Sequence, residues 1–274
     1  MTGTPGIEGS IIRIAAPAAA LIALFWRGAI PVRLREGMTI IAAILTLIAV
    51  HIMWKQAFAI ADMDRFAMLG MAERTLWEAL LASAMLVSWR LGGRRIAIGL
   101  GLASLLHFAW FTMLLHNPLW SEQLAGPWLI PAYGIAFALV WLSTFVLPEA
   151  GRIRDGVRMV LILLLATSLL RQLFHGSLLS ESGVSQAEDI GRSLLAIAIA
   201  IGFLQWGIRR ATRDWRIASL ALMLAAVGKV FLFDAAGLDG LMRIASFAAL
   251  GFSLIGVGWL YSRYLPDAAQ AVDR

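Results

Sequence analysis

The sequence contains no cysteine, two lysines and few charged residues of any kind. Asp, Glu, Lys and Arg make up 15% of its 274 residues, whereas 60% are hydrophobic and the mean hydropathy is +0.80. The absence of cysteine excludes disulfides and every zinc or iron–sulfur site that uses thiolate ligands. Soluble domains are about 45–50% apolar, so a water-soluble fold of this chain would leave too much apolar surface in water. We therefore expect the chain to be embedded in a lipid bilayer.

Nine apolar runs divide the chain, and each is long enough to cross a hydrocarbon core of roughly 30 Å as a helix. They cover residues 10–26, 38–61, 72–89, 96–115, 128–147, 157–173, 190–208, 215–233 and 241–261. The sequence therefore predicts an all-α fold, a polytopic transmembrane helix bundle with about nine spans. We expect a single integral membrane domain over residues 1–274, with helices one to five in residues 1–150 and helices six to nine in residues 151–274.

Arginines are concentrated in every second connection between these runs, and this alternation predicts the orientation. Those connections and the C-terminus hold 15 of the 23 basic residues but only six of the 17 acids. Loops rich in Lys and Arg stay on the cytoplasmic side. We therefore expect a multi-pass protein of the bacterial inner (cytoplasmic) membrane, with its N-terminus outside and its C-terminus inside. This arrangement also accounts for the net charge of +6, so no nucleic-acid partner is indicated.

The remaining ionisable residues gather on the predicted outer side. All four histidines and both lysines lie there, together with Glu78 and Arg171; the histidines and lysines are His51, His107, His116, His175, Lys55 and Lys229. Ionisable groups at membrane depth are costly, so they are functional candidates by default. The pattern predicts an outward-facing polar site. The alternative is that each side chain extends to the interface or pairs locally.

One charged hairpin between the last two runs is the first candidate site. It carries Lys229, Asp234, Asp239 and Arg243 within fifteen residues. Asp234 would lie at the C-terminal end of a helix, where the helix dipole disfavours an anion, so it needs a cation such as Lys229 or Arg243. Asp239 can instead cap the next helix. The hairpin is thus either a salt-bridge clasp between two helices or part of a ligand site.

Arg171 and His175 form a second candidate, because residues four apart share one face of a helix. They are suited to binding an anionic group, and His175 to carrying a proton. Glu188 and Asp189, at the start of the following helix, are possible acidic partners for Arg171.

Glu78, His51 and Lys55 are secondary candidates on earlier helices. Glu78 stands four residues after Arg74, a spacing that favours an ion pair, and His51 stands one turn before Lys55. Glu78, His51 or His175 would be the acid or base if the protein were an enzyme of the outer leaflet. The histidine spacing does not match a metal motif, and no nucleotide-binding motif occurs, so no cofactor is expected.

Small residues line one face of the last run and indicate helix packing rather than chemistry. Ala245, Ala249 and Ser253 share this face, with Gly251, Gly256 and Gly258 nearby. Such faces allow close approach of helices in membranes, so partner membrane proteins are possible ligands for it.

The last 110 residues resemble a family of predicted bacterial membrane proteins, domain of unknown function 2339. The resemblance rests on two elements, which are Arg171 with Phe174-His175-Gly176, and then Lys229-Val-Phe-Leu-Phe-Asp234 followed by Gly240-Leu241, Arg243, Ser246-Phe247 and Leu260-Tyr261-Ser-Arg263. Met242 stands where we expect an aromatic residue. Members of the family are typically longer, so we expect a shortened relative or a C-terminal piece. The resemblance implies an inner-membrane bundle but no reaction.

Three functions follow as expectations. The first is binding or moving an anionic lipid, lipid-linked substrate or envelope precursor at Lys229, Asp234, Arg243, Arg171 and His175. The second is a non-catalytic membrane subunit or scaffold in which the hairpin is a clasp. The third is an enzyme acting at the outer leaflet, which we rank last because no nucleophile stands at a recognisable spacing from a base.

Overall fold

The computed structural model describes residues 12–13, 16–28, 31–60, 62–146, 148–230 and 241–264. Helices account for nearly all of these ranges, and the extended pairing in them is a single antiparallel bridge between Leu124 and Leu178. The chain separates into two compact units. Unit 1 is Met1–Leu139 with Ser177–Glu181, and unit 2 is Val140–Gly176 with Ser182–Arg274.

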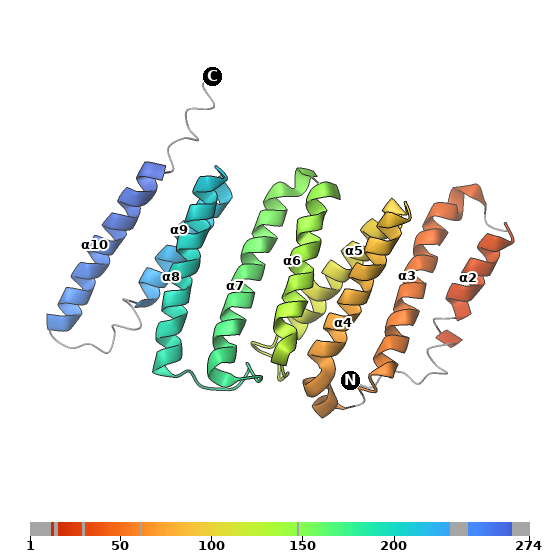
Figure 1. Ribbon diagram of the computed structural model, residues 1–274, viewed down its shortest axis with the longest axis horizontal. Helices are drawn as coiled ribbons and strands as arrows, with labels where there is room; N and C mark the ends of the chain where they lie inside the picture. Colours follow the sequence, from red (N-terminus) through yellow and green to blue (C-terminus); the bar gives the residue numbers. More distant parts are fainter. Residues whose placement is uncertain are drawn as a thin grey trace, which may run out of the picture. The chain divides into compact units, whose positions relative to one another are not determined.

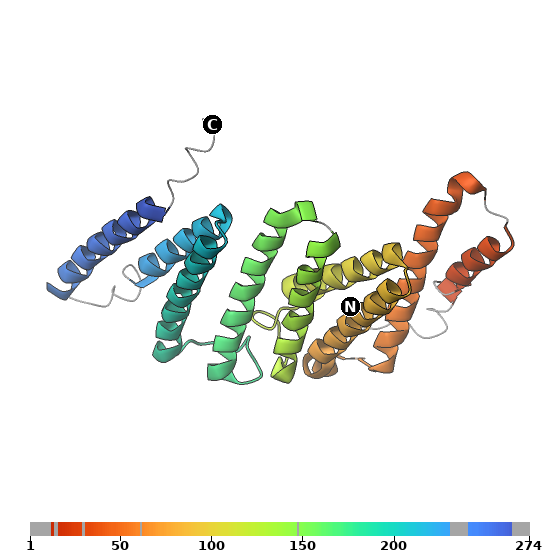
Figure 2. The ribbon, with the colours of Figure 1, turned by 45° about the horizontal axis from the view of Figure 1, so that its top comes forward.

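Unit 1 is built around the pair of helices α4 and α5, which lie side by side (Figures 1 and 2). Its elements are α2 (Ala16–Trp26), α3 (Val32–Ala57), α4 (Met63–Arg90), α5 (Arg94–His107), the π-helical segment η2 (Phe108–Leu115), the 3-10 turn η3 (Gly126–Trp128) and most of α6 (Leu129–Val146). Asp62 caps α4 by accepting the Arg65 N–H at 2.7 Å. Gly92, with φ +81°, allows the tight turn between α4 and α5.

Unit 2 is built around α8 and α9, which lie side by side in the same way. Its elements are the end of α6, the 3-10 turn η4 (Pro148–Ala150), α7 (Gly151–His175), α8 (Gln186–Arg209), α9 (Arg213–Lys229) and α10 (Leu241–Tyr264). Close approach of α8 and α9 requires Gly207, because a Cβ there would stand 3.0 Å from the backbone nitrogen of Arg216. The Phe203 and Trp215 rings meet edge-to-face in the core beside Met159 of α7.

Each of the nine apolar runs lies largely on a helix within the described ranges, so the all-helical membrane fold is confirmed. Five helical segments are long and apolar enough to cross a membrane, namely Arg33–Ala57, Arg94–Leu115, Gly126–Val146, Pro148–His175 and Gln186–Arg209. By contrast, α2 has 11 residues, α9 has 17, and α4 carries Glu73, Arg74 and Glu78 in its middle turns. The number of nine spans and the direction of the termini stay predictions.

The distribution of side chains is that of a protein surrounded by lipid. Large apolar residues stand on the outside of the helices, for example Ile130, Phe145 and Leu194, each more than 60% exposed. Four charged side chains among the described residues are buried instead, namely Glu73, Arg74, Glu78 and Glu188. A water-soluble domain places these two classes the other way round.

Within each unit, the connections that carry the arginines lie at one end of the helices and the other connections lie at the opposite end (Figure 1). In unit 1 the arginine-bearing connections join α2 to α3 and α4 to α5. In unit 2 they join α6 to α7 and α8 to α9. This is the alternation that the orientation prediction requires.

Candidate functional site

A buried carboxylate at the start of α8 holds together the polar residues of unit 2. Glu188 Oε1 accepts from Arg171 Nη1 at 2.9 Å and from Arg192 Nη2 at 2.7 Å, and its Oε2 lies 2.8 Å from His175 Nε2. Arg171 and His175 stand one turn apart near the end of α7, as the spacing predicted. Both oxygens of Glu188 are therefore engaged, and its charge is compensated.

The local sequence explains why Glu188 occupies this place. Ser185 caps α8 by accepting the Glu188 N–H at 3.1 Å. The pattern Ser-x-x-Glu is a capping box, in which the glutamate usually turns back to its own helix start. Here the carboxylate of Glu188 faces α7 instead. The cap fixes the first turn of α8, and the glutamate is left to bind the two α7 residues.

Lys229, at the end of α9, binds Asp189, which follows Glu188 in the first turn of α8. Its Nζ lies 3.0 Å from Asp189 Oδ1, donates to Ser193 Oγ at 2.9 Å and reaches the Asp189 carbonyl at 3.4 Å. The side chains of Lys229 and Asp189 are 31% and 41% exposed. Lys229 is thus at the edge of the cluster rather than inside it.

The structure therefore brings three of the predicted site residues, Arg171, His175 and Lys229, to the first turns of α8. We call these residues together with Arg192, Glu188, Asp189 and Ser193 the α8 cluster. Asp234 and Asp239 lie outside the described residues, as does any contact between Lys229 and Asp234. Arg243 is in α10, but its side chain is not described. Arg192 was missed because nothing in the sequence set it apart from other interface arginines.

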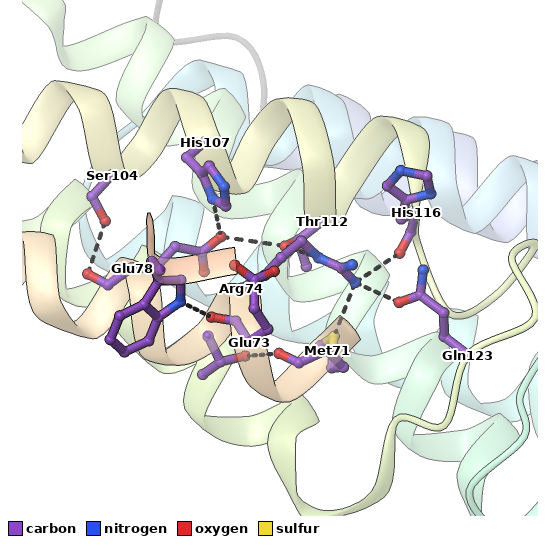
Figure 3. Close-up of polar contacts among 11 residues, drawn as sticks. Met71, Glu73, Arg74, Glu78, Ser104, His107, Thr112, His116 and Gln123 are labelled. Carbon is purple, nitrogen blue, oxygen red and sulfur yellow. Dashed lines mark hydrogen bonds and ion pairs between the residues drawn. The ribbon is translucent and has the colours of Figure 1, made fainter. Parts of the chain in front are cut away.

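A second group of polar residues is buried in unit 1 (Figure 3). Glu78 of α4 is fully buried, and its Oε1 lies 3.0 Å from His107 Nδ1 on α5 and 3.3 Å from Thr112 Oγ1 on η2. Ser104 of α5 donates to the backbone carbonyl of Glu78 at 3.2 Å. This hydrogen bond joins α5 to α4 about one turn before His107. Glu78 therefore faces the α5–η2 segment.

Arg74 does not form the predicted ion pair with Glu78 and reaches across to η2 and the loop after it (Figure 3). Its Nε donates to Thr112 Oγ1 at 3.3 Å, and its Nη2 donates to the His116 carbonyl at 3.4 Å and to Gln123 Oε1. Thr112 thus bridges Arg74 and Glu78. A guanidinium carries several donors that point in different directions, so Arg74 can reach acceptors on other segments. The spacing of four residues between Arg74 and Glu78 therefore predicted the wrong partner.

His51 and Lys55 of α3 complete this group. The His51 ring lies 4.7 Å from the Trp77 ring and 5.2 Å from the His107 ring, between centroids. The Lys55 ammonium stands over the Phe111 ring at 5.5 Å. We call Glu73, Arg74, Glu78, His107, Thr112, His51 and Lys55 the α4 cluster. Glu73 stands next to Arg74 in the sequence and was grouped with Arg74 and Glu78, whereas Gln123 was not predicted, because it stands in no pattern with the other polar residues.

His116, just after η2, stands at the edge of this group, and its carbonyl receives Arg74. Burial lowers the pKa of its imidazole, and the charges of Arg74 and Lys55 lower it further. The His116 ring is therefore neutral at pH 7 and adds no positive charge to the α4 cluster.

Neither cluster has the arrangement of a metal site. In the part of the chain that the structure describes, no group of three or more His, Asp or Glu side chains is placed to hold a metal ion. What the two clusters offer is charge and proton chemistry. The α8 cluster has positive charge at the start of a helix, and the α4 cluster has a carboxylate against imidazoles.

Comparison with known proteins identifies a family. The family model described as "Predicted membrane protein (DUF2339)" matches residues 4–264. The match extends far beyond the C-terminal part on which the sequence resemblance rested. No curated protein and no solved structure matches the chain. Because the family model covers nearly its whole length, the chain belongs to the DUF2339 family of predicted membrane proteins.

Proposed function

We propose that this protein crosses the bacterial inner membrane about nine times as a single integral domain, and binds or moves an anionic envelope or lipid-linked substrate at the α8 cluster. The N-terminus and the α8 cluster face outward, and the C-terminus faces the cytoplasm. The segregation of arginine-bearing connections to one end of each unit supports this orientation.

The observation that carries the proposal is the gathering of three permanent cations at the first turns of one helix. Three permanent cations, Arg171, Arg192 and Lys229, meet two carboxylates, Glu188 and Asp189. The cluster also stands at the N-terminus of α8, where the backbone amides and the helix dipole favour an anion. An anionic headgroup would meet these cations and the helix N-terminus at one place.

The exposure of the cations suggests how a ligand reaches them. Arg171 and His175 are 12% and 14% exposed and hold Glu188, so they position the cluster. Arg192 and Lys229 are 37% and 31% exposed. These two side chains are the ones that an anionic headgroup can contact directly. Asp234, Asp239 and Arg243 follow Lys229 closely in sequence and are candidates for the rim of the same site.

Weaker binding of anionic lipid is the expected result of Arg192→Gln and of Lys229→Gln. The probe is short-chain phosphatidylglycerol, titrated against phosphatidylcholine on the purified protein in nanodiscs. Loss of one charge-assisted contact should raise Kd about tenfold or more in each variant. Arg152→Gln is the matched control, since Arg152 is an exposed arginine of unit 2, 91% exposed, that pairs with Asp214 and lies outside the cluster. Equal binding of both lipids, or unchanged binding by both variants, would contradict the proposal.

The orientation has its own test. We expect a reporter that is active only in the periplasm to be active when it is fused at Ser182. At Arg94 and Arg154 we expect the same reporter to be inactive and a reporter that is active only in the cytoplasm to be active. A cytoplasmic Ser182 would move the α8 cluster to the other side of the membrane and contradict an outward-facing site.

A scaffold role is the alternative, and the three contacts of Glu188 favour it. In this case the α8 cluster is a clasp that joins α7, α8 and α9, and the small residues of α10 bind partner helices. Among the described residues, nothing lies within 4 Å of a Cβ added at Gly251, Gly256 or Gly258, so another helix can approach α10 closely at these positions. A clasp predicts that Lys229→Gln and Asp189→Asn lose stability non-additively while lipid binding is unchanged.

A further inference from the structure

The α4 cluster has a use that the proposed function does not require. Glu78, His107 and His51 form a row that joins α4, α5 and α3. Glu78 Oε1 lies 3.0 Å from His107 Nδ1, and the His107 and His51 rings lie 5.2 Å apart between centroids. The side chains of Glu78 and His107 are 0% and 9% exposed, so these two are closed to the surroundings of the helices, while His51 is half-buried.

Five polar atoms of this cluster are buried without a hydrogen-bond partner among the described residues. They are His51 Nδ1, Glu73 Oε1, Arg74 Nη1, Glu78 Oε2 and His107 Nε2. Each unsatisfied buried group costs about 1–3 kcal/mol, so their concentration in one place is expensive. Glu188 of unit 2, whose side chain is also 0% exposed, has both oxygens engaged. A group built for stability alone would resemble Glu188.

We propose that Glu78, His107 and His51 form a proton-binding and proton-transfer site inside unit 1. A proton needs no cavity, and it converts an unpaired acceptor into a donor without moving the backbone. A carboxylate and two imidazoles are the side chains that exchange protons near neutral pH. The spare capacity of Glu78 Oε2, His107 Nε2 and His51 Nδ1 is what such an exchange requires.

The transfer step is simple in atoms and charge. When Glu78 is protonated on Oε1, its O–H bond breaks as an N–H bond forms at His107 Nδ1. This leaves a carboxylate and an imidazolium. The imidazolium then releases the proton on Nε2 to His51 Nδ1, which becomes the imidazolium, and His107 becomes neutral again with its hydrogen on Nδ1. Neither of these two nitrogens has a hydrogen-bond partner among the described residues, so this second transfer requires rotation of one of the two rings. Rotation of the ring or return of the proton restores the starting tautomer.

The surrounding charges set the balance between the carboxylate and the protonated form of Glu78. Arg74 on α4 is 2% exposed and reaches Glu78 through Thr112, so it stabilises the carboxylate. Lys55 on α3 is half-buried and stands over the Phe111 ring. Glu73, also on α4 and 2% exposed, opposes the effect of Arg74. His116 follows η2 and is neutral at pH 7. Two buried carboxylates thus share one fully buried cation, a balance in which a proton is readily gained or lost.

The row leads toward the predicted outer end of unit 1. Lys55 stands one turn beyond His51 on α3, close to the connection between α3 and α4. The arginine-bearing connections lie at the opposite end of the unit. Exchange with the outer solution through His51 and Lys55 is therefore the shorter route.

The test is an infrared pH titration of the full-length protein in nanodiscs. We expect a carboxylic-acid C=O band that disappears as the pH is raised between about 5 and 9, and its absence in Glu78→Gln. His107→Gln should move the midpoint of this band by about one pH unit or more, because the partner of Oε1 changes from a proton acceptor to an amide. Glu122→Gln, an exposed carboxylate of the same unit, should leave the band unchanged.

Proton movement is read separately in proteoliposomes with an enclosed pH dye. His51→Gln should slow proton entry into the vesicles, or proton exchange at Glu78, at least severalfold. The infrared band of protonated Glu78 should persist in this variant. The proposal would be overturned if no Glu78 band titrates in that range, or if the midpoint of the band is the same in His107→Gln as in the wild type. If Glu78→Gln does not accumulate, His107→Gln on the same band decides it. Lipid binding at the α8 cluster is a separate measurement, so each proposal can fail alone.

Discussion

Glu188→Gln is expected to destabilise the protein by about 3–5 kcal/mol, the largest loss that a single substitution in unit 2 should give. The amide keeps the size of the carboxylate but removes its charge. Arg171 and Arg192 would then keep their positive charges next to a neutral, fully buried group. The amide nitrogen would also point a donor at one of the donors that now surround the carboxylate. The thermal unfolding midpoint of the detergent-solubilised protein and its level in the membrane fraction measure the effect.

A matched control for this prediction exists in the same unit. Asp214 pairs with Arg152 at 3.7 Å, and the two side chains are 45% and 91% exposed. Exposed ion pairs contribute about 0–1 kcal/mol, so Asp214→Asn should leave the unfolding midpoint almost unchanged. Combining Glu188→Gln with Arg171→Gln should recover part of the loss, because one uncompensated cation is removed. Equal effects of Glu188→Gln and Asp214→Asn would show that the α8 cluster does not hold unit 2 together.

The sequence predicted the helices well, because a long apolar run leaves few choices to a chain in lipid. All nine runs lie on helices within the described residues. The prediction of nine membrane crossings is supported less sharply, since five helical segments of the described residues satisfy both the length and the composition of a membrane span. The helix α4 shows why. Its charged turns lower the apolarity of the segment, yet Glu73, Arg74 and Glu78 are buried against other helices rather than exposed to lipid.

Partners of charged residues were predictable where the helix period or the next helix start set them. Arg171 and His175 share a face, and Glu188 was one of two acids expected opposite Arg171, whereas its contact with His175 was not predicted. Lys229 shows the limit. The structure pairs it with Asp189, forty residues earlier, a contact that no spacing in the sequence indicated, while its sequence candidate Asp234 lies outside the described residues. Such a contact depends on how α8 and α9 pack, which neighbouring residues do not reveal.

Arg74→Lys is expected to be nearly as damaging as Arg74→Ala, with a loss of about 3 kcal/mol or more for both. The guanidinium serves three acceptors in different directions, namely Thr112 Oγ1, Gln123 Oε1 and the His116 carbonyl. A lysine keeps the charge, but its single ammonium cannot reach all three from the same backbone position. At least one buried acceptor would be left unsatisfied, and two buried carboxylates would lose their close guanidinium.

The control variant for Arg74 is Arg65→Lys on the same helix. Arg65 is exposed and donates to one backbone carbonyl, that of Ala59 at 3.2 Å, so a lysine should replace it at close to wild-type stability. Thermal unfolding of the two lysine variants in the same detergent separates loss of geometry from loss of charge. If Arg74→Lys unfolds like the wild type while Arg74→Ala does not, then charge alone stabilises the α4 cluster. In that case the fork between η2 and Gln123 would be incidental, and Glu78 would be governed by its cations rather than by its hydrogen bonds.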